Sequence, residues 1–149
     1  MTRTARAGGF TLIELVTVLI ILGVLAVVAL PRISGLSDYK ALEFHDKALA
    51  ALRHGQKSAT SHRRLVCVAF TSTSVTLTIA RVNGAAVCSD PLLLPGSDSN
   101  SVLSGDAANA FFDTLPADFN FQPDGSAADR SLTVAGRPIT VVGATGNVR

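Results

Sequence analysis

The sequence has little net charge, only two cysteines and a single long apolar run. Its 149 residues include 13 lysines and arginines against 11 acidic residues, which leaves a formal net charge of +2. So small a charge excludes a nucleic-acid binder that depends on bulk electrostatic attraction. One apolar run excludes a membrane protein with several spans, and a hydrophobic fraction of 48% excludes a disordered chain. The length is that of about one domain.

The chain also lacks any arrangement of side chains that is typical of catalysis. Ser61 and His62 are neighbours, but they belong to no nucleophile-elbow pattern. Cys67 and Cys88 are 21 positions apart with no clustered histidines, which does not match a zinc motif. The sequence therefore predicts that the protein is not an enzyme and holds no cofactor and no metal.

The N-terminal segment is the most informative part of the sequence. Residues 1–9 are short and basic, and residues 10–30 then form an apolar run of 21 residues with one charge, Glu14. A helix of this length spans roughly 31 Å, enough for one bilayer crossing. Arg3 and Arg6 precede the run, which predicts an N-terminus in the cytoplasm and a body outside it.

Glu14 distinguishes this run from an ordinary export signal. A secretory signal has a shorter apolar core than residues 10–30. A plain signal anchor explains the length but not the acid, because a carboxylate inside a membrane segment costs a few kcal/mol. Glu14 is therefore a candidate functional residue that needs a partner.

The stretch Gly9-Phe10-Thr11-Leu12-Ile13-Glu14 resembles the class III leader of type IV pilins and type II secretion pseudopilins. The resemblance implies that a prepilin peptidase cuts between Gly9 and Phe10 and methylates the new amino group of Phe10. It also implies that Glu14, the fifth mature residue, pairs with the N-terminus of a neighbouring subunit during filament assembly. Pro31 falls at mature position 22, where many pilins carry a proline.

The function implied is that of a minor pilin, which enters a type IV pilus or primes its assembly. Its partners are then other pilin subunits, the prepilin peptidase and the bacterial inner membrane, with the globular domain in the periplasm before assembly. The alternative is a minor pseudopilin of a type II secretion system.

The resemblance and the patterning together predict four segments and an α+β pilin fold, a long N-terminal helix packed on an antiparallel sheet. Residues 1–9 are the leader, 10–30 the transmembrane and assembly helix, 31–63 the amphipathic half of that helix, and 64–149 a globular β domain. Pro31 and Gly35 predict a kink or a melted turn. The apolar stripe predicted for the amphipathic half consists of Leu42, His45, Leu49, Leu52, Gln56 and Ala59.

The second half has the alternation of strands. Residues 65–70 and 75–82 predict a hairpin, and a short strand is expected at 86–88. Further strands are expected at 119–121, 131–135, 138–142 and 145–149.

Residues 90–129 differ from the rest, with seven aspartates and no basic residue. Apart from the strand at 119–121 and a helical turn expected at 108–115, they predict a long acidic loop region, either functional or an insertion. Asp98, Asn100 and Asp106 do not have the spacing of a calcium loop, so a solvated acidic loop is favoured.

The two cysteines predict a disulfide between Cys67 and Cys88, because exported pairs are usually bonded. Two buried thiols are the alternative.

The second half also resembles the GspH/FimT-like minor pilins and those of mannose-sensitive haemagglutinin systems. Some FimT-like pilins bind DNA through a Gly-Arg-x-Arg ending, which makes a DNA-binding minor pilin the third hypothesis. Here the ending reads Gly146-Asn147-Val148-Arg149, without the first arginine. Arg137 is a possible spatial substitute, and the acidic region opposes phosphate. The resemblance is carried by residues 51–57, 63–68, 139–142 and 146–149.

Overall fold

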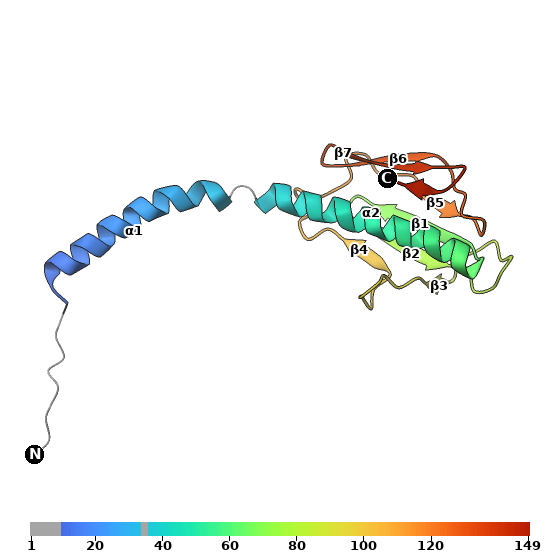
Figure 1. Cartoon of the computed structure of the whole chain (residues 1–149), viewed down its shortest axis with the longest axis horizontal. Coiled ribbons are helices and arrows are strands. Elements are labelled where there is room, and N and C mark those ends of the chain that lie inside the picture. The colour runs from blue at the N-terminus through green and yellow to red at the C-terminus, as the bar shows by residue number, and fades with distance from the viewer. Residues whose placement is uncertain (1–9, 34–35) are drawn as a thin grey trace, which may run out of the picture. The chain divides into compact units, whose positions relative to one another are not determined.

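The structure is a computed structural model that describes the backbone of residues 10–33 and 36–149, and the side chains of 10–26 and 38–149 (Figure 1). The chain divides into two compact units, residues 1–36 and 37–149, each of which is described by itself. The predicted leader 1–9, with Gly9, lies outside the described residues, and so does Gly35.

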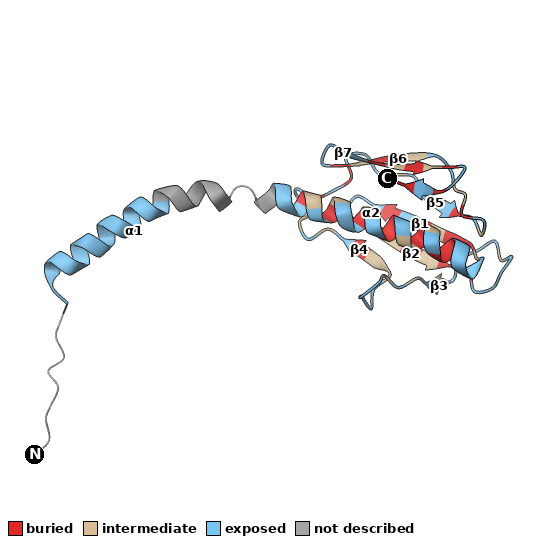
Figure 2. Cartoon of the chain, in the orientation of Figure 1, coloured by how far each residue is buried: buried red, intermediate tan, exposed pale blue. Residues whose placement is uncertain are grey.

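The described residues 10–33 of the first unit contain one helix, α1, over Leu12–Ile33. Its described side chains are exposed along their whole length, as Figure 2 shows. Pro31 lies within the bounds of α1, so the predicted kink there stays a prediction. In the described part of the chain, no helix combines the length and the apolar character that crossing a bilayer requires.

The second unit begins with α2, Leu36–His62, which was predicted to end near residue 61. Its predicted buried stripe was displaced by about one position around the helix. Ala59 and Leu52 are buried as expected, but Leu42, His45, Leu49 and Gln56 are only half-buried. The reason is that small side chains let the helix lie close to the sheet, whereas the predicted stripe was placed on the larger side chains, mainly leucines. The residues that form the buried face are Ala41, Phe44, Ala48, Ala51, Leu52, Gly55, Ser58 and Ala59.

Two antiparallel sheets complete the unit, where a single meander was expected. The first has the order β3-β2-β1-β5, with β4 also pairing with β2. The predicted hairpin is confirmed, since β1 pairs with β2 from Val66 opposite Ile79 to Thr71 opposite Ser74. The bounds are β1 Val66–Thr71, β2 Ser74–Ile79, β3 Asp90–Pro91, β4 Ser101–Leu103 and β5 Phe119–Phe121.

Two details of this sheet differ from the prediction. The strand expected at 86–88 is wrong, because pairing with β2 begins only at Asp90. β2 ends at Ile79 rather than at residue 82. The backbone N–H of Ala80 still donates to the carbonyl of Leu65, and beyond it the Arg81 side chain bonds to Asp90 across the loop.

The second sheet has the order β6-β7-β8, over Arg130–Val134, Arg137–Val142 and Asn147–Val148. The turn between β6 and β7 has positive φ at Ala135 (48°) and Gly136 (75°), the backbone of a tight hairpin. These strands confirm the three predicted at the C-terminal end, with shifted bounds.

α2 contacts both sheets, so the core lies beneath this helix (Figures 1 and 2). On one side Gly55 lies against Leu77 and Phe121. On the other, Arg53 Nε donates to the carbonyl of Val148 at 2.9 Å and Gln56 Nε2 to that of Thr145 at 2.8 Å. The helix therefore holds the end of the chain in place.

The acidic region is part of the core and not an insertion. It supplies β3, β4 and β5, and its buried side chains include Val102, Ala110 and Phe112. The ring of Phe112 packs edge-on against those of Phe44 at 5.3 Å and Phe70 at 5.5 Å. In place of the helical turn expected over residues 108–115 there is one isolated turn, in which Ala110 donates to the carbonyl of Asp106.

Candidate functional site

The start of α1 contains a reciprocal set of hydrogen bonds between Thr11 and Glu14. The backbone N–H and the hydroxyl of Thr11 both donate to Glu14 Oε2 at 3.2 Å, and the backbone N–H of Glu14 donates to Thr11 Oγ1 at 3.3 Å. This is a capping box, in which a threonine and a glutamate three residues later satisfy each other's unpaired amides. The glutamate side chain is therefore folded back on the first turn of its own helix.

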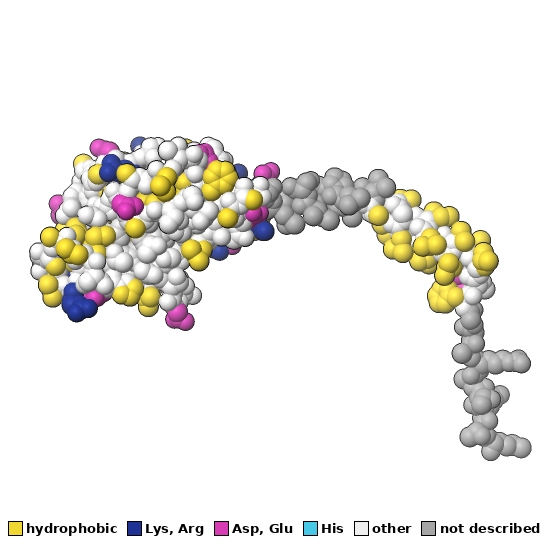
Figure 3. Space-filling model, turned by 180° about the vertical axis from the view of Figure 1, so that it is seen from behind, with side chains coloured by type: hydrophobic (Ala, Val, Ile, Leu, Met, Phe, Trp, Pro, Cys, Tyr) yellow, Lys and Arg dark blue, Asp and Glu magenta, His cyan; other side chains and the backbone are white. Residues whose placement is uncertain are grey.

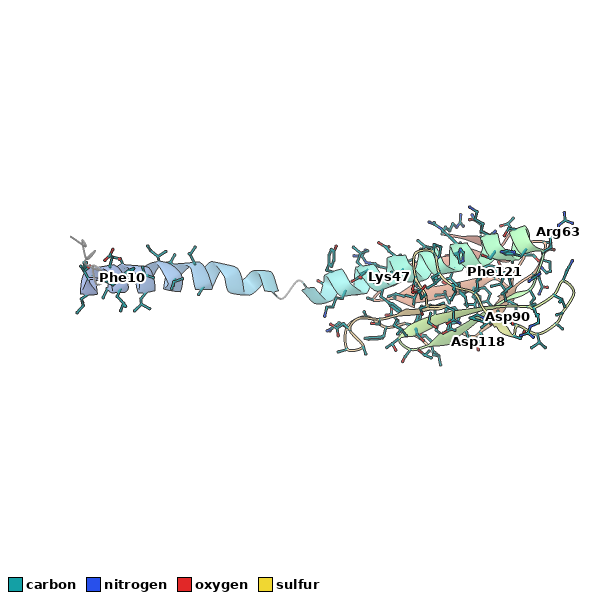
Figure 4. The ribbon with its side chains drawn as sticks, turned by 90° about the horizontal axis from the view of Figure 1, so that it is seen from below. Phe10, Lys47, Arg63, Asp90, Asp118 and Phe121 are labelled. Atoms are coloured by element: carbon teal, nitrogen blue, oxygen red, sulfur yellow. A yellow bond between two sulfur atoms is a disulfide. The ribbon has the colours of Figure 1, made fainter. Side chains whose placement is uncertain are left out.

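Apolar side chains surround this carboxylate. Phe10, Leu12 and Ile13 are 79%, 81% and 67% exposed, and Glu14 is the only charged residue among residues 10–26. Figure 3 shows the described part of this helix covered by hydrophobic side chains, and Figure 4 places Phe10 at its start. An apolar surface of this extent needs an apolar partner, and the charge of the acid within it needs a cation.

Thr11 is the residue that the sequence interpretation missed. The signal was present, because Thr11-Leu12-Ile13-Glu14 followed by an apolar run is the threonine-x-x-glutamate signature of a helix start. Glu14 was interpreted as an unpaired membrane acid, and its hydrogen bonds with Thr11 were not predicted.

The disulfide expected between Cys67 and Cys88 is present, with 6.0 Å between their Cα atoms. It fastens the loop after β2 to β1. A second contact closes the same loop, since the guanidinium of Arg81 donates to one oxygen of Asp90 at 3.0 and 3.2 Å. The hydrogen bond from Arg81 lowers the pKa of Asp90 below its ordinary value.

Most aspartates of the acidic region are exposed, as the predicted solvated loop requires. Five of the seven also accept a hydrogen bond from a backbone amide and so fasten a turn or a loop. The amide donors are Ala108 to Asp106, Gly136 to Asp113, Phe70 to Asp118, Ser126 to Asp124 and Gly143 to Asp129, at 2.7 to 3.2 Å.

Hydrogen bonds from neighbouring side chains lower the pKa of two of these aspartates. The amide of Asn109 lowers the pKa of Asp106, and the hydroxyl of Ser126 lowers the pKa of Asp124. In the part of the chain that the structure describes, no three acidic, histidine or cysteine side chains gather as a metal site.

Known proteins resemble parts of this chain. Residues 4–30 match the family model of the prokaryotic N-terminal methylation motif. The type IV narrow pilus major component PilA5 of Thermus thermophilus is 44% identical over 55 residues, which are 37% of this chain and 47% of that protein. The chain therefore spans about half the length of this relative. No solved structure matches it.

The N-terminal segment of the chain carries the methylation motif of the type IV pilin family. Members of this family are structural subunits rather than enzymes, and the matched motif is that of a membrane-anchored pilin. The observed helix on antiparallel strands agrees with the pilin fold.

Of the residues predicted for assembly, Phe10 and Glu14 lie together at the start of α1. Pro31 lies near the other end of that helix, within its bounds, and Gly9 and Gly35 fall outside the described residues.

The two arginines considered for DNA binding do not share a face of the second sheet. Arg149 exchanges backbone hydrogen bonds with Thr140 and so lies on the Thr140 face. Arg137 is three positions before Thr140 on β7 and therefore belongs to the opposite face. Arg137 does not replace the arginine that is missing from the ending.

Proposed function

We propose that this protein is a minor subunit of a type IV pilus. It is made as a precursor in the inner membrane, a prepilin peptidase cuts it between Gly9 and Phe10, and the amino group of Phe10 is methylated. α1 then enters the filament and packs against the same helix of neighbouring pilin subunits. The globular domain faces outward.

The observation that carries this proposal is the lone carboxylate of Glu14 in the first turn of an exposed apolar helix. An apolar helix surface is buried when it packs against other helices, which removes the acid from water. The acid then needs a cation, because a buried charge is stable only when it is paired. The methylated amino group of a neighbouring Phe10 is basic and supplies that cation.

Three further observations support parts of the proposal. The disulfide between Cys67 and Cys88 suits a domain outside the cytoplasm. The printed name of the Thermus relative is that of a pilus component, which favours a pilus over a type II secretion pseudopilus. The minor role rests on the resemblance of residues 51–57, 63–68, 139–142 and 146–149 to GspH/FimT-like minor pilins, whereas the printed name of the Thermus relative is that of a major component. The opposite faces of Arg137 and Arg149 give no support to DNA binding.

Replacement of Glu14 by glutamine tests the proposal, since it keeps the side chain's shape and removes its charge. We expect Glu14→Gln to insert in the membrane normally and to be recovered in sheared filaments at least tenfold less than the natural protein. Tenfold corresponds to about 1.4 kcal/mol, well below the cost of leaving a buried cation unpaired. Recovery of Glu14→Gln in filaments at the natural level contradicts the proposed role of Glu14.

A further inference from the structure

Thr11 engages only one oxygen of the carboxylate on which assembly is proposed to depend. Its N–H and its hydroxyl both donate to Glu14 Oε2. Within the described residues, Oε1 of the same carboxylate accepts no hydrogen bond. A carboxylate offers two acceptor oxygens, so the cap leaves half of this capacity for another donor.

The cap also fixes the position of the remaining oxygen. A free glutamate side chain samples many rotamers, and ordering it costs conformational entropy when a partner arrives. Two bonds from Thr11 hold the Glu14 side chain against the first turn before any partner is present. A binding group that is ordered in advance binds more strongly, because this cost does not recur on association.

We propose that Thr11 is a positioning residue for Glu14, which holds Oε2 and presents Oε1 to the amino group of a neighbouring subunit. The inference rests on the proposed function and adds a residue to it. The bond that forms is charge-assisted, from the ammonium of the neighbour to Oε1, and such bonds are the strong ones. The bonds from Thr11 persist when the ammonium binds, because Thr11 donates to Oε2 and the ammonium donates to Oε1.

Thr17 provides a matched control on the same helix. Its hydroxyl donates to the backbone carbonyl of Glu14 at 2.9 Å and not to the carboxylate. Thr17→Val therefore removes the same hydroxyl as Thr11→Val, at the same sequence distance from Glu14, and leaves the carboxylate's donors in place.

The first measurement is incorporation of the full-length protein in cells that assemble filaments. We expect Thr11→Val to be processed and inserted normally, and the ratio of its sheared to membrane fraction to fall about fivefold, the effect of losing one of the two hydrogen bonds that hold Oε2. Thr11→Ser and Thr17→Val should stay within about twofold of the natural ratio. A ratio of sheared to membrane fraction in Thr11→Val equal to that in Thr17→Val overturns the inference.

The second measurement reports on the carboxylate itself. The chain contains only two glutamates, Glu14 and Glu43, so carboxyl ¹³C labelling of glutamate gives two signals in the detergent-solubilised protein. We expect Thr11→Val to shift the Glu14 signal and leave that of Glu43, which is paired with Lys47. Thr17→Val should move neither. A Glu14 signal unchanged in Thr11→Val shows that Thr11 does not act on the carboxylate.

Glu14→Gln separates the failure of this inference from that of the proposed function. Loss of Glu14→Gln from filaments together with normal Thr11→Val overturns only the positioning role. Normal incorporation of Glu14→Gln overturns both.

Discussion

Asp118 accepts a hydrogen bond from the backbone N–H of Phe70 at 2.9 Å, two residues beyond the last pair between β1 and β5. The carboxylate takes the place of a strand partner where β5 has already ended. The strand continues through Phe70 to Thr71, and the ring of Phe70 packs against that of Phe112. One acidic side chain thus joins the acidic region to the central hairpin.

Removal of this acceptor should destabilise the domain. We expect Asp118→Ala to lower the free energy of unfolding by about 1–3 kcal/mol, because a part-buried amide loses its partner. Guanidinium unfolding of the full chain in detergent measures the change. Asp98→Ala is the control, since no hydrogen bond of the Asp98 side chain is present in the described residues, and it should stay within about 0.5 kcal/mol. Equal effects of the two variants contradict the assigned role of Asp118.

Loss of the disulfide should destabilise the domain more. The bond between Cys67 and Cys88 has a sequence separation of 21, and a loop of that size contributes roughly 3 kcal/mol in the chain-entropy model. Replacement of both cysteines by serine should lower the free energy of unfolding by about that amount. Reduction with a dithiol should have the same effect on the natural protein and none on the double variant. Insensitivity of the natural protein to reduction is the contrary result.

Two glycines should respond in opposite directions to alanine. Gly146 has φ of +62°, and a Cβ there meets the backbone carbonyl of Gly125. Gly146→Ala should therefore cost about 2 kcal/mol or more. A Cβ on Gly55 makes only ordinary contacts at 3.5 Å with Leu77 and Phe121. Gly55→Ala should stabilise the domain by about 0.5–1 kcal/mol, because alanine favours a helix interior. Thermal unfolding of both variants measures the change in stability. Melting temperatures that shift in the same direction in both variants would refute the prediction.

Three aspartates should make the stability of the domain depend on pH in acid. The pKa values of Asp90, Asp106 and Asp124 are lowered in the folded protein by the side chains of Arg81, Asn109 and Ser126, in that order. A lowered folded pKa stabilises the protein above the ordinary aspartate value of 3.8, and the contribution is lost as pH falls through the folded pKa.

We expect the free energy of unfolding to decline below about pH 4 and this decline to be shallower in Asp124→Asn. Unfolding curves at several pH values measure the slope. An unchanged acid slope in this variant removes Asp124 from the account.

Much of the fold follows from periodic patterns in the sequence. Alternation over residues 75–82 predicted the strand that is now β2, and the apolar run from residue 10 predicted α1. Short elements carry no such pattern. β4 has only three residues, and its place beside β2 depends on bonds such as that from Asn100 Nδ2 to the carbonyl of Leu77 at 3.0 Å.

The remaining errors have two physical sources. The predicted buried face of α2 was displaced because alanines such as Ala48 allow close approach to the sheet but add little to a hydrophobic pattern. The aspartates are mostly exposed as predicted, but their bonds to backbone amides were missed, because a bond from a distant amide, as from Gly143 to Asp129, leaves no mark in the local sequence. At the candidate site the acid was predicted and its cap was not.

Mass spectrometry of the mature chain in sheared surface filaments, and in the membranes left behind, tests the central proposal most directly. The account predicts a species that begins at methylated Phe10 and is present in the sheared fraction. A chain that still begins at Met1, or one that begins at Leu30, contradicts it.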